Sequence, residues 1–371
     1  MRQSHTKETL IASHVFSVRT APQPETAFGL SPNTIARSPR SFYPKNIEMH
    51  EQPEITDPSP PTLNHVIGQR QVVQQLRVAL DAFYNDRSAC ANQELALCHI
   101  LLCGPPGTGK SLLSQIIARE LASDVHEELA QNILTPGHLQ GLLMLAETGD
   151  VVFVDEIHEL PPIAQTTLYR CLEERRLFLG GDRKNITLPP FTFIAATTDQ
   201  WALSKPLRDR FKIILHLSHY SQNEIGEIVS QRAKRLRWNM TDDAVVALAV
   251  RGRGTPRIAI RLLEAVRRTA RAEGTEVITL DHVKRMCDVE SYDALGLDAL
   301  ERRYLQLLRE AQGPLRLNII ATHMGLPRRT IEGVIESELI RLGMITKAED
   351  GRMLTGAGAK HLSECTAVEN Q

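Results

Sequence analysis

The stretch GPPGTGKS at residues 104–111 indicates how this sequence is organised. It fits the pattern G-x-x-x-x-G-K-[ST], in which glycines let the backbone curl so that successive N–H groups point at phosphate oxygens. We expect Lys110 to reach the β- and γ-phosphates of a nucleotide and the Ser111 hydroxyl to bind Mg²⁺. The loop residues predicted to bind the nucleotide are Gly104, Pro105, Gly107, Thr108, Gly109, Lys110 and Ser111.

The segments on either side of this loop supply the context that such a site needs. An apolar run, LALCHILLC at residues 95–103, precedes it and is typical of a buried parallel strand. Residues 111–122 follow, with apolar side chains repeated along one helical face. The positive N-terminal end of that helix would attract phosphate. The sequence therefore predicts a nucleotide site between a strand and a helix.

A pair of carboxylates follows a second apolar run, VVFV at residues 151–154. Asp155 at the end of a strand is suited to hold Mg²⁺, and Glu156 is placed to polarise an attacking water. Alone, an Asp-Glu pair after a strand is an ordinary polar turn. Asp155 lies 45 residues after Lys110, and this pairing favours nucleotide hydrolysis. We expect nearby His158 to be a hydrogen-bonded structural residue.

Three further polar groups follow the next predicted strand, residues 191–196. A hydroxyl of Thr197 or Thr198 could sense the γ-phosphate, although a threonine pair also satisfies the backbone at strand ends. Arg208 or Arg210 could act as an arginine finger, or form a solvated charged turn. Arg257 stands beside a predicted helix start, where the dipole disfavours a cation, so a ligand anion is a plausible partner.

Composition excludes several classes of protein. The chain has 371 residues, with 43 Lys and Arg against 44 Asp and Glu, so it is not a globally basic nucleic-acid binder. Local basic patches remain possible. The six cysteines form no C-x-x-C pair and no zinc or disulfide framework, which favours reduced thiols in the cytoplasm. No apolar run has the 18 or more residues of a membrane helix.

The pattern along the chain predicts several parts. Residues 1–61 hold nine of the 20 prolines and no regular apolar period, so we expect a disordered tail. Strands alternate with helices over residues 62–219, which predicts an α/β domain with a parallel sheet covered on both faces. After about residue 219 we expect no more strands until the last domain. We assign residues 220–290 to helices, residues 291–364 to helix, turn, helix and two short β-like pieces, and residues 365–371 to a tail.

The ordered set of motifs resembles the RuvB family of AAA+ motors, which drive branch migration of Holliday junctions in bacteria. The resemblance runs from about Leu63 to Leu362. The motifs that carry it are VIGQ at 66–69, GPPGTGKS, VDEIHELP at 154–161, LPPFTFIAATT at 188–198, LSKPLRDRF at 203–211, RGTPRIAIRLL at 253–263 and ALGLDALERRYL at 294–305.

This resemblance implies an AAA+ P-loop ATPase domain, a small helical lid domain and a C-terminal winged helix. In such a protein Lys110, Ser111 and Asp155 would bind ATP and Mg²⁺, and Glu156 would activate water. Thr198, or its neighbour Thr197, would be the sensor on the sheet.

The resemblance also implies roles for residues that act on a neighbouring subunit or lie near the bound nucleotide. Arg210, with Arg208 as second candidate, would be the finger acting on a neighbouring subunit. Arg257 would be the lid sensor, and Ile67 and Tyr220 would lie near the adenine. The family forms hexameric rings around duplex DNA, so homohexamer formation is expected here.

The terminal domain would contact DNA phosphates in this family. A recognition helix near Pro327 would carry Ile331, Val334 and Ile335 inward. The basic residues available for contact are Arg328 and Arg329 on that helix and Arg352 on the wing. The family's junction-binding partner, RuvA, docks on a hairpin whose counterpart here, residues 175–187, is shorter.

Two other interpretations remain open from the sequence. The chain could be an AAA+ paralogue that remodels or loads proteins, because residues 291–364 balance ten basic against ten acidic residues. It could instead be a nucleotide-binding scaffold without turnover. A scaffold needs no water-activating carboxylate, so Glu156 argues against that interpretation.

Overall fold

The computed structural model describes residues 59–89, 95–179 and 184–369. The predicted tail therefore lies outside the described residues up to residue 58. Its last residues are held against the rest of the chain. Arg119 donates a hydrogen bond of 3.3 Å to the Pro60 carbonyl, and Arg235 donates one to the carbonyl of Ser59. The packed chain thus includes Ser59, earlier than the predicted boundary at residue 62.

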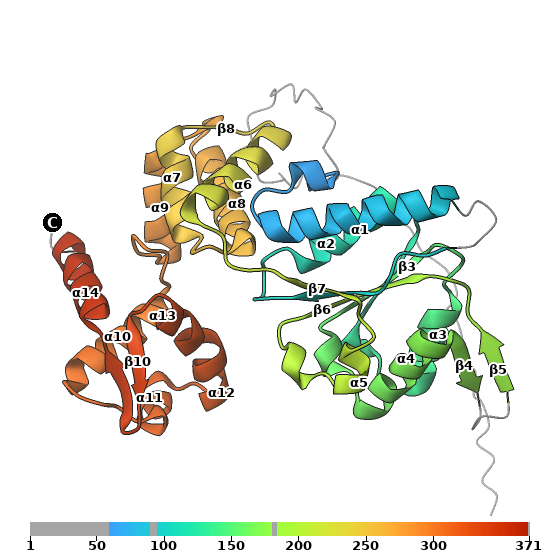
Figure 1. Ribbon diagram of the computed structural model, residues 1–371. Helices are drawn as coiled ribbons and strands as arrows, with labels where there is room; N and C mark the ends of the chain where they lie inside the picture. The colour runs from blue at the N-terminus through green and yellow to red at the C-terminus, as the bar shows by residue number, and fades with distance from the viewer. Residues whose placement is uncertain (1–58, 90–94, 180–183, 370–371) are drawn as a thin grey trace, which may run out of the picture. The chain divides into compact units, whose positions relative to one another are not determined.

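A five-stranded parallel sheet forms the centre of the first domain (Figure 1). Its order is β2-β3-β6-β1-β7, so the connections that leave the neighbouring strands β1 and β6 cross the sheet in opposite directions. Parallel strands end at one edge, and that edge is where ligands bind in sheets of this kind. The strands are β1 (Ile100–Cys103), β2 (Val125–Leu129), β3 (Val151–Asp155), β6 (Thr192–Thr197) and β7 (Ile213–His216).

Alternate residues of the buried strands enter two separate cores. Ile100 and Leu102 of β1 face one core, while Leu101 and Cys103 face the other. This follows from the twofold side-chain period of a strand, and it explains why the run is apolar throughout. The first core is covered by α1 (Arg70–Ala89) and α2 (Lys110–Leu121), and the second by α3 (Pro136–Met144), α4 (Pro162–Glu174) and α5 (Lys205–Arg208) (Figure 1).

The sequence interpretation did not predict two strands of the sheet, β2 and β7, and it predicted β1 with too many residues. β2 is an edge strand of sequence VHEEL, so its apolar signal is weak. β7 is only four residues long. The run at residues 95–103 becomes a strand only from Ile100, because the Phe193 N–H donates to the Nδ1 atom of His99 rather than to a strand carbonyl.

A two-stranded antiparallel hairpin projects between α4 and β6. It consists of β4 (Arg176–Leu179) and β5 (Lys184–Thr187), with Arg176 opposite Thr187. Short 3₁₀ turns occur at Leu63–His65, Ala130–Asn132, Ile157–Glu159 and Gln200–Ala202.

Four helices with their own apolar core follow the sheet domain. They are α6 (Gln222–Arg235), α7 (Asp242–Arg251), α8 (Pro256–Ala272) and α9 (Leu280–Glu290). Ser221 and Glu224 form a capping box that fixes the start of α6. The prediction that strands stop here was wrong in one detail, because β8 (Asn239–Met240) and β9 (Val277–Ile278) form a short parallel ladder.

The last part of the chain is a helix-turn-helix followed by a β-hairpin, as expected. α10 (Ala299–Ala311) and α11 (Leu317–Met324) precede a helix that begins with α12 (Arg328–Thr330), passes through a π-helical turn at Ile331–Glu336 and ends with α13 (Ser337–Arg341). The hairpin pairs β10 (Ile345–Ala348) with β11 (Gly351–Leu354), and α14 (Gly356–Glu369) closes the domain (Figure 1).

Two expectations for this last part need correction. Ile331 and Ile335 are buried, but Val334 is 66% exposed. The π-helical turn is wider than an α-helical one, so the residue four positions after Ile331 faces the core and Val334 turns outward. The predicted tail at residues 365–371 was also wrong in part, because α14 continues to Glu369.

Among the described residues, no helix is both long enough and apolar enough to cross a membrane.

Candidate functional site

The loop between β1 and α2 has a backbone shape that only glycine tolerates at two points. Gly104 has φ of 151°, and a Cβ there would lie 2.5 Å from the Leu217 carbonyl oxygen. Gly107 has φ of 75°, and its Cβ would lie 2.9 Å from side-chain atoms of both Thr255 and Arg257. The loop is therefore curled tightly between the sheet and the start of α8.

Lys110 lies inside this curl with only 6% of its surface exposed. Its Nζ donates to the carbonyl oxygens of Gly104 at 2.8 Å and Pro105 at 3.0 Å. Burial lowers the pKa of Lys110, while the nearby carboxylates of Glu156 and Asp155 oppose that shift. The ammonium group is thus held at the loop by weak neutral acceptors, which an anionic ligand can replace.

A hydroxyl and a carboxylate meet where β3 ends beside α2. Ser111 Oγ donates to Asp155 Oδ2 at 2.8 Å, and the Glu156 N–H donates to Asp155 Oδ1 at 2.9 Å. In nucleotide sites, Mg²⁺ binds to one or two oxygen ligands of the protein that lie beside the phosphate loop. The donor set of Ser111 and Asp155 therefore fits this ion.

Glu156 is held by the end of the neighbouring strand. Its Oε2 accepts hydrogen bonds from the N–H and the Oγ1 of Thr198, both at 3.2 Å. His158 Nδ1 lies 3.3 Å from the same oxygen. Glu156 itself has φ of 48°, a left-handed conformation that is uncommon outside glycine and directs its side chain out of the strand.

The two threonines at the end of β6 differ in their surroundings. Thr198 contacts Glu156, whereas Thr197 is fully buried and its hydroxyl pairs with His158 Nδ1 at 3.0 Å. His158 was predicted to be structural, and nothing in the sequence indicated that it contacts both Thr197 and Glu156. The only available signal was its position three residues after Asp155, which brings it back to the sheet edge.

Residues from the helical domain close the other side of the cleft. The Tyr220 hydroxyl donates to the Thr108 carbonyl at 3.0 Å, and the Arg257 N–H donates to the Gly107 carbonyl at 3.3 Å. Burial raises the pKa of Tyr220 to about 12, so its hydroxyl keeps the proton that it donates. Ile67 and Tyr220 line one pocket beside Gly109.

The cleft itself has a volume of about 490 Å³. Polar residues from the loop, from β3 and from α8 converge on it: Gly107, Gly109, Lys110, Ser111, Asp155, Glu156 and Arg257. This size and this charge distribution suit a nucleotide phosphate chain with its counterion.

Arg208 and Arg210 do not line this cleft. Arg210 Nη2 lies 2.8 Å from Glu173 Oε2. The guanidinium of Arg208 instead stacks 4.7 Å from the ring centre of Trp201, which is 74% exposed. Both arginines thus face away from their own chain's nucleotide site.

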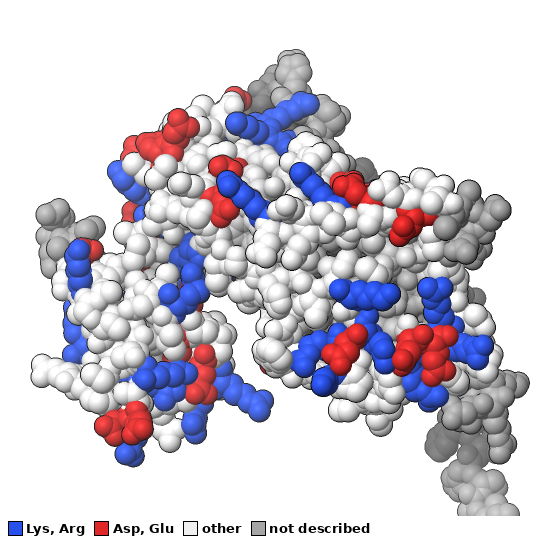
Figure 2. Space-filling model, in the orientation of Figure 1, with Lys and Arg blue, Asp and Glu red and all other residues white. Residues whose placement is uncertain are grey.

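The three basic residues predicted to contact DNA lie in different environments. Arg328 and Arg329 are exposed at the start of α12. Arg352 is held inside its domain, where it donates to Glu336 at 2.9 Å and to Glu332 at 3.0 Å. Lys and Arg side chains project from the end of the domain that carries α12, with acidic side chains among them (Figures 1 and 2).

Three protein-family models match the chain consecutively. The model for the Holliday junction DNA helicase RuvB P-loop domain matches residues 59–217. The RuvB AAA lid domain matches residues 220–293, and the RuvB C-terminal winged helix domain matches residues 294–363.

Similar proteins cover most of the same region. The Holliday junction branch migration complex subunit RuvB of Prochlorococcus marinus is 39% identical over 312 residues, which is 82% of this chain and 87% of the relative. The subunit of the same name from Limosilactobacillus reuteri is 36% identical over 323 residues, or 85% and 93% of the two chains. The solved Thermotoga maritima RuvB Holliday junction branch migration motor superposes with a TM-score of 0.71 at 36% identity, over 82% of this chain and 98% of that one.

Proposed function

This chain belongs to the RuvB family, and from that premise we propose that it is an ATP-driven motor for branch migration of Holliday junctions. One observation carries the proposal. Lys110, Ser111, Asp155 and Glu156 line one cleft, in a chain that matches the family through the lid and the winged helix. The alternative of a protein-remodelling paralogue is not favoured, because that match includes the domain on which the alternative depended.

ATP would bind with its phosphates in the curl of the loop. Lys110 would exchange its two carbonyl acceptors for phosphate oxygens, which are stronger partners because they are charged. The N–H groups of Gly107, Thr108 and Gly109 would complete the cradle, with Gly104 and Pro105 shaping its entry. We propose Ile67 and Tyr220 as the residues beside the adenine.

Ser111 and Asp155 would hold Mg²⁺, which when bound neutralises charge on the β- and γ-phosphates. Glu156 would accept a proton from the attacking water as its general base. The bonds from Thr198 orient this carboxylate through Oε2, so its other oxygen, Oε1, would accept from the water. Thr198, not the buried Thr197, is therefore the better candidate for a sensor that links the γ-phosphate to Glu156.

Charge developing on the γ-phosphate would be stabilised from two sides. Arg257 lines the cleft of its own chain and would act as the lid sensor. Arg210 would act as a finger on the site of the next subunit, with Arg208 as the second candidate. Such a contact in trans requires a closed ring, which we propose to be a hexamer.

The winged helix would grip the phosphates of DNA without reading its sequence. Arg328 and Arg329 are exposed and available for this. Arg352 has to leave Glu336 and Glu332 before it can contact DNA, so we place it last among the three. The hairpin of β4 and β5 is the proposed docking site for a RuvA-like junction-binding partner.

We further propose that the protein works in the cytoplasm and that its domains divide near residues 62, 220 and 291. The four apolar cores support this division, since two lie within the sheet domain, one within the helical domain and one within the last domain. No disulfide joins two of the cysteines that the structure describes, which suits a reducing compartment.

The test is ATP hydrolysis with and without four-way junction DNA. We expect the DNA to stimulate turnover, and the variant Lys110→Ala to abolish it both with and without DNA because phosphate binding is lost.

Arg328→Ala with Arg329→Ala should retain basal hydrolysis but weaken DNA binding and reduce its salt dependence. Replacing exposed Arg303 by Ala gives a matched control. Hydrolysis indifferent to any DNA, with no DNA binding at low salt, would contradict the motor and favour the protein-remodelling alternative.

A further inference from the structure

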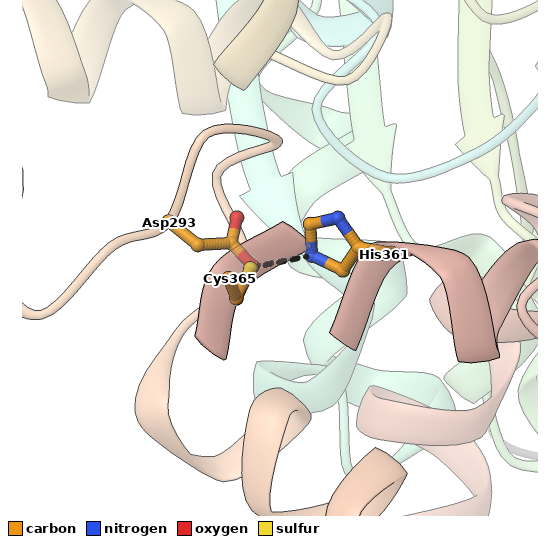
Figure 3. A group of neighbouring side chains, drawn as sticks. All are labelled: Asp293, His361 and Cys365. Carbon is orange, nitrogen blue, oxygen red and sulfur yellow. Dashed lines mark hydrogen bonds and ion pairs between the residues drawn. The ribbon is translucent and has the colours of Figure 1, made fainter. Parts of the chain in front are cut away.

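Three potential metal ligands converge in the C-terminal domain, and none of them lines the nucleotide cleft (Figure 3). They are Asp293, in the turn before α10, and His361 and Cys365 on α14. Their ligand atoms all lie within 4.8 Å of one another. Asp293 and His361 are almost completely buried, with 4% and 7% of their side chains exposed.

The positions of these residues in their elements explain the convergence. His361 and Cys365 are four residues apart on one helix, so their side chains leave the same face of α14. Asp293 is preoriented, because its Oδ1 accepts the N–H groups of Leu295 and Leu297, both at 2.9 Å. Its second oxygen, Oδ2, is thereby directed at His361.

The geometry resembles a metal site more than a catalytic relay. His361 Nε2 lies 2.7 Å from Asp293 Oδ2 and 3.5 Å from Cys365 Sγ. In a cysteine–histidine–aspartate relay the thiol and the carboxylate contact opposite nitrogens of the ring. Here both contact the same nitrogen, so no proton can pass through the ring from one to the other. All three groups instead point at one shared space (Figure 3).

The distances are close to those of a tetrahedral zinc site. Bond lengths of about 2.3 Å to sulfur and about 2.0–2.1 Å to nitrogen or oxygen place two ligand atoms about 3.3–3.6 Å apart. The separation of 3.5 Å between Sγ and Nε2 already agrees with this. The Nε2–Oδ2 pair, at 2.7 Å, would widen by roughly 0.6 Å, and the Sγ–Oδ2 pair, at 4.0 Å, would close by roughly 0.4 Å. These are side-chain adjustments only.

We propose that Asp293, His361 and Cys365 bind one Zn²⁺ ion, which ties α14 to the turn at the start of the C-terminal domain. A thiolate, an imidazole and a carboxylate are ligands that zinc accepts together, whereas Mg²⁺ and Ca²⁺ require oxygen. On binding, the Cys365 thiol releases its proton and His361 coordinates through an unprotonated Nε2. Water completes the fourth position.

The proposal does not depend on the motor function and adds a structural role. The ion would bridge two points of the chain that are 68 residues apart, across the whole winged-helix segment. Since the site forms only in the folded chain, its binding energy would add to the stability of this domain. Sequence spacing could not reveal it, because the aspartate is remote from the H-x-x-x-C pair.

The test uses the full-length protein, stripped of metal and kept reduced with a phosphine. Cobalt(II) is titrated with excess Mg²⁺ present to occupy oxygen sites. We expect one equivalent of Co²⁺ per chain, a near-ultraviolet charge-transfer band from the thiolate, and displacement by one equivalent of Zn²⁺. Cys365→Ala should remove the band and weaken Zn²⁺ binding about 100-fold or more, since a direct ligand exceeds the 10–100-fold effect of outer partners.

The matched control is Cys98→Ala, because Cys98 is also a half-buried free thiol but lies in the sheet domain. It should bind both metals like the wild type. Zn²⁺ should also raise the unfolding temperature of the wild type but not of Cys365→Ala. A thiolate band that persists in Cys365→Ala, or no Co²⁺ binding by the wild type, would overturn the proposal and leave the three residues as a hydrogen-bonded group only.

Discussion

Glu156 shows how the end of a neighbouring strand positions a carboxylate at the cleft. Both hydrogen bonds from Thr198 end on its Oε2 atom, and His158 lies beside that atom as well. A γ-phosphate at the sheet edge would compete for the Thr198 hydroxyl, and we expect ATP binding to release that one of the two bonds on Oε2.

Glu156→Gln should lower kcat for ATP about 100-fold or more while leaving ATP affinity within a few-fold of the wild type. The amide retains the shape and the Thr198 contact but cannot accept a proton from water. Steady-state hydrolysis and calorimetric ATP binding measure the two quantities. The control is Glu159→Gln, a half-exposed carboxylate whose Oε1 lies 3.5 Å from His158 Nε2. Hydrolysis by Glu156→Gln at the wild-type rate would remove Glu156 from this role.

At this scale the sequence predicted which residues meet at the cleft better than it predicted their contacts. Lys110, Ser111, Asp155 and Glu156 were identified from two short motifs, because local spacing places them at neighbouring strand ends. The choice between Thr197 and Thr198 was left open, since it depends on which hydroxyl is buried at the end of β6 and which one contacts Glu156. The pairing of Arg210 with Glu173 was not foreseen, because it joins separate elements.

At the scale of single elements, the contact between His99 and β6 should make the stability of the sheet depend on pH. This residue precedes β1, and its Nδ1 accepts the N–H of Phe193 in β6. Burial lowers the pKa of His99 to about 4, with Arg175 adding to the effect. The imidazole is therefore neutral in the folded protein, and protonating it would break the hydrogen bond to the strand.

Stability should fall as the pH decreases from about 6.5 toward about 4. The unfolded chain takes up the His99 proton near pH 6.5, and the folded chain does so only near pH 4, so acid favours unfolding by about 3 kcal/mol at the lower limit. Thermal unfolding of the wild type and of His99→Asn, which retains an acceptor but cannot be protonated, measures this. The variant should lose less stability in acid.

The matched control for His99 is His323→Asn. His323 is exposed on α11 in another domain, so its replacement should leave the pH dependence unchanged. Equal acid sensitivity of the wild type and His99→Asn would show that the imidazole does not carry this dependence.

Elements were predictable where burial is complete. β3 and β6 are buried at nearly every residue and appear as continuous apolar runs, so both were found. β2 has only alternate, partly buried positions, and its sequence VHEEL lacks a strand signal. The outward turn of Val334 could not be predicted, because a π-helical turn changes the helical period without a sequence mark.

At the scale of the whole molecule, a buried ion pair joins the lid to the winged helix. Arg253 Nη1 donates to both oxygens of Glu301, at 2.8 and 2.9 Å, and their side chains are 10% and 7% exposed. Arg341 donates in turn to the Arg253 carbonyl at 2.8 Å. Burial raises the pKa of Glu301 despite the guanidinium, so removing Arg253 would leave a costly acid behind.

Arg253→Ala should abolish stimulation of ATP hydrolysis by junction DNA and leave DNA-free hydrolysis within about twofold. Removing one partner of a buried ion pair costs about 3–5 kcal/mol of stability. This loss would weaken the contact between the winged helix and the lid, by which we expect DNA binding to affect hydrolysis. Hydrolysis rates with and without DNA provide the measurement. Arg268→Ala, at an exposed pair with Glu290 within the lid, is the control. Undiminished stimulation in Arg253→Ala would mean that the signal passes elsewhere.

The lid forms hydrogen bonds to the main chain of the phosphate loop. The bonds from Tyr220 and Arg257 end on the carbonyl oxygens of Thr108 and Gly107, not on side chains. Substitutions in the loop that preserve its backbone shape therefore leave this attachment intact. Evolution and protein engineering can therefore alter the loop's chemistry, and so the nucleotide preference or the speed of hydrolysis, without removing the hydrogen bonds between the lid and the loop.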